Sequence, residues 1–165
     1  MRTVVMLCLI GVALLLEQTV LHFVRVAGVK PDLVLLLVVF NGVIKGSREG
    51  ALWGFVAGLL EDLACGHYIG LYALSKLAAG YAAGLGRYVY KESSVVVAAM
   101  VWGVSLVSGS ITYLLLLTLG ITVMPTDAFL RVVLPVAVYN ALLSLLFYHW
   151  FHRATVYGIL REERF

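Results

Sequence analysis

Charged side chains and cysteines are both scarce in this chain of 165 residues. Lysine, arginine, aspartate and glutamate make up 13% of it, whereas 62% of the residues are hydrophobic. The mean hydropathy is +1.02, and the apolar runs are too long and too numerous for a water-soluble core. The sequence therefore predicts an integral membrane protein. Its two cysteines, Cys8 and Cys65, are expected near opposite faces of the membrane, so neither a disulfide nor a cysteine metal site is indicated.

The predicted fold is an all-α bundle in which residues 1–165 form a single transmembrane domain. A spanning helix needs about 20 apolar residues, so this length accommodates about six helices and short loops, with no room for a soluble catalytic domain. The first helix has no small-residue cleavage site after its apolar part, and we expect it to be retained. The expected helices cover approximately residues 3–23, 33–44, 50–63, 71–90, 95–119 and 130–151.

Lysine and arginine are distributed unevenly between the predicted loops. If the N-terminus is inside, eight of these cations lie on the inner side and three on the outer side, and Lys76 falls within the fourth helix. The positive-inside rule then places both termini in the cytoplasm. The inner cations are Arg2, Lys45, Arg48, Arg87, Lys91, Arg153, Arg161 and Arg164, and the outer cations are Arg25, Lys30 and Arg131. The net charge of +3 therefore reflects topology and lipid headgroups and does not indicate a nucleic-acid partner.

Glycine recurs at every fourth position through the third predicted helix. Gly50, Gly54 and Gly58 therefore share one smooth helix face. Within a membrane, such a face lets another helix approach closely. That helix belongs either to the same bundle or to a partner protein. The next position in the series holds Asp62, directly after Glu61, and carboxylates near a bilayer require water, a cation or a polar partner.

Charged residues within helices or at their ends gather toward the predicted outer leaflet. Asp62 ends the third helix, and Lys76 lies about one and a half turns into the fourth, so we expect a buried ion pair between them. In the alternative, Glu61 and Asp62 are hydrated at the loop and Lys76 extends its ammonium group outward. The gathered residues are Glu17, Asp32, Glu61, Asp62, His67 and Lys76, of which Asp32, Glu61, Asp62 and Lys76 form the candidate outer-side polar cluster.

The remaining motifs do not indicate a catalytic, cofactor or metal site. His149 and His152 have the spacing of helical metal ligands, but the sequence offers no third ligand beside them. Ser108 has no base on the same predicted helix face, so nucleophilic catalysis is not indicated. Asn41 and Asn140 are single amides in apolar helices, where interhelical hydrogen bonding is the usual role.

Several short motifs follow one another between Pro31 and Arg87. They are Pro31-Asp-Leu-Val-Leu-Leu36, the basic turn Lys45-Gly-Ser-Arg-Glu-Gly50, the segment Gly54-Phe-Val-Ala-Gly-Leu-Leu-Glu-Asp62, and Gly66 to Leu74 followed by Lys76, Gly80-Tyr81 and Gly84. In this order they resemble the MreD family, a membrane component of the bacterial rod-shape and cell-wall elongation machinery. Glu61 departs from the family pattern, which usually has an uncharged residue beside the acid.

The resemblance implies a non-enzymatic scaffold of the bacterial cytoplasmic membrane that needs no cofactor. It implies binding to MreC, and through MreC an influence on the MreB filament, on the RodA glycosyltransferase and on its class B penicillin-binding transpeptidase. MreD proteins are similar in fold to the S component of energy-coupling-factor vitamin transporters, so a substrate-binding subunit for vitamin uptake is the alternative. An intramembrane protease or lipid-modifying transferase is a third class, for which the sequence shows no paired nucleophile and base.

Overall fold

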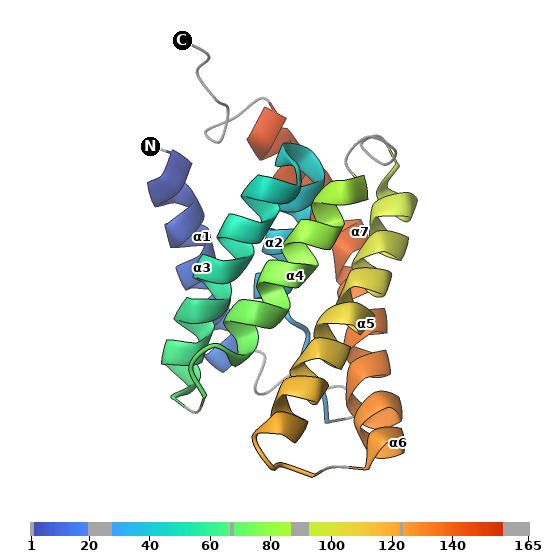
Figure 1. The fold of residues 1–165 in the computed structure, drawn as a ribbon. Coiled ribbons are helices and arrows are strands. Elements are labelled where there is room, and N and C mark those ends of the chain that lie inside the picture. Colours follow the sequence, from blue (N-terminus) through green and yellow to red (C-terminus); the bar gives the residue numbers. More distant parts are fainter. Residues whose placement is uncertain (1, 20–27, 67, 87–92, 123, 157–165) are drawn as a thin grey trace.

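The protein is a bundle of helices that run alternately up and down (Figure 1). The computed structural model describes residues 2–19, 28–66, 68–86, 93–122 and 124–156. The first five helices are α1 (Arg2–Thr19), α2 (Leu33–Lys45), α3 (Ser47–Cys65), α4 (Leu71–Leu85) and α5 (Ser94–Thr118). The chain then forms α6 (Pro125–Ala128), the π-helical turn η2 (Phe129–Val133) and α7 (Leu134–Val156), which follow one another without a break.

The observed helices match the predicted ones closely in the middle of the chain. α2 differs from its predicted range by one residue at its end, and α5 by one residue at each end, whereas α3 extends beyond 50–63 on both sides. α4 ends at Leu85, and residue 86 continues as a short 3₁₀ turn. The predicted helix ends 20–23 and 87–90 lie outside the described residues, as do His67 and five of the cations used for the orientation, namely Arg25, Arg87, Lys91, Arg161 and Arg164.

The last helix begins earlier than the sequence indicated. The prediction of a loop up to residue 127 and a helix from residue 130 is wrong, because α6 begins at Pro125. Proline is favoured at the first helical position, where its missing N–H would have no partner in any case. Further on, Pro135 has no N–H to offer the carbonyl of Arg131. The wider turn of η2 lies just before this proline. There the N–H of Leu134 bonds to the carbonyl of Phe129, five residues earlier, as in a π-helix.

α2 is the central helix of the bundle. Ten of its thirteen residues are buried, because α1, α3, α4 and α7 surround it. A helix that is apolar on every face is covered either by neighbouring helices or by lipid, and for α2 the neighbouring helices supply most of this cover. Phe40 of α2 packs against the rings of Tyr148 and Phe151 of α7, with centroid distances of 5.4 and 5.5 Å.

The outer helices present apolar side chains to the surroundings. Ser94–Thr118 and Pro125–Arg153 are long and apolar enough to cross a membrane, and Thr3–Thr19 and Leu33–Lys45 are shorter apolar helices. Large hydrophobic side chains on the outside include Leu114, Leu142, Leu146 and Trp150. Such surfaces are typical of helices that face lipid.

The charged residues predicted for the site lie at one end of the bundle. The start of α1, the corner between α2 and α3, the end of α4 and the end of α7 lie at the same end (Figure 1). The turn between α3 and α4 and the start of α2 lie at the opposite end. Asp32, Glu61, Asp62 and Lys76 all belong to this second end, so the alternating course of the helices brings them close together.

Candidate functional site

The glycine face of α3 packs directly on α4. A Cβ atom added at Gly54 would overlap the backbone carbonyl of Lys76, and one added at Gly58 would overlap that of Tyr72, at separations below 3.0 Å. Gly50 has the same relation to α4, and real Cβ atoms do not come this close to backbone. Of the two alternatives for this stripe, packing inside the bundle is therefore the one that the structure shows. The glycine face, for which a partner helix was the other alternative, is covered by α4.

Asp62 caps the start of α4. Its Oδ2 accepts hydrogen bonds from the backbone N–H groups of Gly70 at 2.8 Å and Ala73 at 3.1 Å, and its Oδ1 accepts one from Tyr72 at 2.9 Å. Free N–H groups and the positive end of the helix dipole favour a carboxylate here. The predicted ion pair between Asp62 and Lys76 is therefore wrong, because backbone amides take up both oxygens of Asp62.

Lys76 pairs with carboxylates from two other segments. Its Nζ lies 2.6 and 2.5 Å from the two carboxylate oxygens of Asp32. It also lies 2.7 Å from Oε2 of Glu61, an ionic contact without hydrogen-bond geometry. Lys76 is 0% exposed and Glu61 is 5% exposed, so the alternative of a hydrated carboxylate and an outward lysine is also wrong. The ring of Tyr72, with its centroid 5.7 Å from Nζ, adds a cation–π contact.

Asp32 connects this ion pair to the rest of the bundle. It is the N-cap of α2, where its Oδ1 accepts the N–H of Leu35 at 2.7 Å. Its own N–H donates to Oδ1 of Asn140 on α7 at 2.9 Å, and Nδ2 of Asn140 donates to Oγ of Ser105 on α5 at 3.2 Å. The interhelical role predicted for Asn140 is thus confirmed. Asn41 differs, since its Nδ2 is buried without a hydrogen-bond partner among the described residues.

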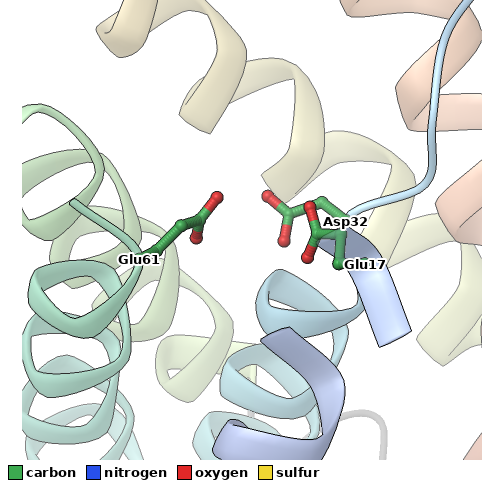
Figure 2. Close-up of side chains that lie close together, drawn as sticks. All are labelled: Glu17, Asp32 and Glu61. Carbon is green, nitrogen blue, oxygen red and sulfur yellow. The ribbon is translucent and has the colours of Figure 1, made fainter. Parts of the chain in front are cut away.

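Glu17 of α1 lies beside the carboxylate of Asp32 (Figure 2). The buried face of α1 consists of Met6, Ile10, Ala13 and Glu17, which recur at helical spacing. Glu17 is only 3% exposed, and its Oε1 lies 3.5 Å from Nζ of Lys30. Figure 2 shows its carboxylate beside that of Asp32, with Glu61 pointing toward both from α3. The sequence predicts Glu17 near the outer leaflet, but Glu17 is not among the residues predicted for the polar cluster. Its helical spacing from Met6, Ile10 and Ala13 is the signal that indicates its burial.

We call Glu17, Asp32, Glu61 and Lys76 the buried charge cluster. One oxygen from each of its three carboxylates lies within 4.8 Å of the others. A ligand set of carboxylate oxygens suits a hard cation, and here the ammonium group of Lys76 already supplies one positive charge. Because the cluster draws on α1, α3, α4 and the start of α2, its most direct effect is to fix these segments relative to one another.

The family comparison agrees with this membrane-type architecture. A family model described as rod shape-determining protein MreD matches residues 1–154 of the chain. This match reaches well beyond the motifs between Pro31 and Arg87. Comparison with curated proteins and with solved structures finds no match, so the likeness to transporter S components stays a prediction. Proteins of the matched family are membrane proteins that determine rod shape, and the chain belongs to this MreD family.

Proposed function

We propose that the protein is a non-enzymatic scaffold of the cell-wall elongation complex, which binds MreC and thereby supports peptidoglycan synthesis. The observation that carries the proposal is the match of residues 1–154 to a family with a role in rod-shape determination. The same match favours this role over vitamin uptake, the alternative function considered from the sequence. MreB, RodA and the class B penicillin-binding transpeptidase are then direct partners, or partners reached through MreC.

The contacts of the charged residues support a structural role for them. Lys76 binds Asp32 and Glu61, while Asp62 binds backbone amides of its own chain. These groups are used to hold helices together, and breaking a buried pair of this kind strongly destabilises a protein. A bundle held in this way can present fixed outer surfaces to a partner.

We further propose a multi-pass topology in the cytoplasmic membrane with both termini in the cytoplasm. The start of α1, the corner after Lys45 and the end of α7 lie at one end of the bundle, and positive charge is expected on the inner side (Figure 1). The buried charge cluster then lies toward the outer leaflet. A reporter active only outside the cytoplasm should be active when inserted at Gly120 and inactive when fused after Phe165. The reverse result would contradict this topology.

Coexpression with a tagged single-span MreC-type protein tests the scaffold proposal. We expect a stoichiometric complex that survives purification in mild detergent. The proposal fails if the wild-type chain inserts into the membrane but does not copurify with this protein.

Glycine variants then locate the partner. Gly54→Leu is unsuitable as an interface probe because it would push α3 away from α4. Gly11 on α1 and Gly103 on α5 are better probes, since an added Cβ at either position meets nothing within 4 Å. Small residues on an outward face permit close approach of another helix. Loss of copurification in Gly11→Leu or in Gly103→Leu, with unchanged thermal stability, would assign the partner to that face.

A further inference from the structure

The buried charge cluster carries more negative than positive charge. Glu17, Asp32 and Glu61 supply three carboxylates, whereas Lys76 and the neighbouring Lys30 supply two ammonium groups. Among the described residues, these five groups leave one negative charge when all of them are ionised. An uncompensated charge away from water is costly, so a further positive group near these carboxylates is strongly favoured.

Glu17 supplies the atom that such a group would bind. Its side chain is 4% exposed, and its contact with Lys30 engages Oε1 at 3.5 Å. Its other oxygen, Oε2, is buried and has no hydrogen-bond partner among the described residues. Figure 2 shows the Glu17 carboxylate directed into the same space as those of Asp32 and Glu61. This unpartnered oxygen is an observation separate from the mere grouping of acidic residues.

We propose that Glu17, Asp32 and Glu61 bind one hard monovalent cation of the sodium type beside the ammonium group of Lys76. The class of ion follows from the ligands, which are all carboxylate oxygens within 4.8 Å of one another. The single charge follows from the excess, because one monovalent ion brings the five ionised groups to neutrality. Lys76 keeps its contacts with Asp32 and Glu61, so the ion completes the cluster and does not replace the lysine.

The proposed ion has a structural consequence for α1. This helix packs on its neighbours through the apolar side chains of Met6, Ile10 and Ala13 and, at its end, through Glu17. A cation shared between Glu17 and Asp32 would tie α1 to the start of α2. Removal of the ion should therefore loosen α1 before the α3–α4 pair, which is held by backbone packing.

Thermal unfolding of the full chain in an uncharged detergent tests the proposal. Sodium chloride is compared with choline chloride at the same concentration and pH, since choline is too large for a site of this size. We expect sodium to raise the unfolding midpoint by about 2–4 °C once it is fivefold above its dissociation constant, and choline to have no such effect. Equal effects of the two salts would overturn the proposal. An unfolding midpoint that rises on acidification while the two salts have equal effects would also overturn it, because a proton would then neutralise the excess charge.

Matched variants assign the ion to this cluster. Glu17→Gln removes the excess charge and should abolish the sodium effect, whereas Asp127→Asn, an exposed carboxylate paired with Arg131 at 3.1 Å, should retain it. A full sodium effect in Glu17→Gln would overturn the assignment. If that variant does not fold, binding of radioactive sodium to the wild-type chain decides, with one ion per chain expected and none contradicting the proposal. A response to calcium but not to sodium would contradict the monovalent assignment.

Discussion

Replacement of Lys76 by methionine should destabilise the protein more than replacement of any exposed lysine. The substitution keeps the length and most of the volume of the side chain but removes the ammonium group from between Asp32 and Glu61. The buried carboxylate of Glu61 and the partly buried carboxylate of Asp32 then lose their cation. Removal of one partner from a buried ion pair costs about 3–5 kcal/mol. For a chain of this size, that corresponds to a fall of about 6–20 °C in the unfolding midpoint.

Thermal unfolding in detergent gives the measurement, and Lys30→Met is the matched control. Lys30 lies 3.5 Å from Glu17, but its side chain is 36% exposed and that of Lys76 is 0% exposed, so the removal of Lys30 should cost less stability than the removal of Lys76. A second comparison restores neutrality by combining Lys76→Met with Asp32→Asn and Glu61→Gln. This triple variant should regain most of the lost stability, because neutral replacements of a buried ion pair are often tolerated and asparagine is also a good N-cap. A midpoint of Lys76→Met equal to that of Lys30→Met would refute the reasoning.

The other contacts lead to three further predictions, each measured by thermal unfolding. Gly54→Ala should cost about 1–3 kcal/mol because its Cβ overlaps the Lys76 carbonyl, whereas Gly103→Ala should cost nothing, and equal midpoints would argue against the tight α3–α4 contact. Asp62→Ala should cost about 2–4 kcal/mol because three backbone N–H groups lose their acceptor, and a wild-type midpoint would be inconsistent with the cap. Asn140→Leu should cost about 1–3 kcal/mol by removing the acceptor of the Asp32 N–H, and no change would show that this bond is dispensable.

Much of the fold could be predicted from the sequence because apolar run lengths determine membrane helices. α5 at Ser94–Thr118 differs from its predicted range by one residue at each end, and α2 at Leu33–Lys45 by one residue at its end. The sequence does not predict the start of the last helix, because polar residues such as Thr126 and Asp127 are typical of a loop. The signal was Pro125, which is favourable at a helix start.

The sequence predicts Asp32, Glu61 and Lys76 as members of the site, but it predicts neither the part played by Glu17 nor the pairing of the charges. Asp62 and Lys76 are close in sequence, and this proximity led to the wrong partner. The turn after α3 offers Asp62 backbone amides that need an acceptor, so the local bond is formed there. Asp32 is 44 residues from Lys76, and it reaches the lysine only because α2 is the central helix of the bundle. Such a contact depends on tertiary packing and leaves no local pattern in the sequence.

The most direct test of the account is the shape of cells that depend on this chain. The central claim is that a helix bundle held by the buried charge cluster supports rod shape as a scaffold. Depletion of the chain should turn rods into round cells, and wild-type or Lys30→Met chains should restore the ratio of cell length to width. Lys76→Met should fail to restore it. Rods that persist after depletion, or full rescue by Lys76→Met at wild-type amounts in the membrane, would contradict the account.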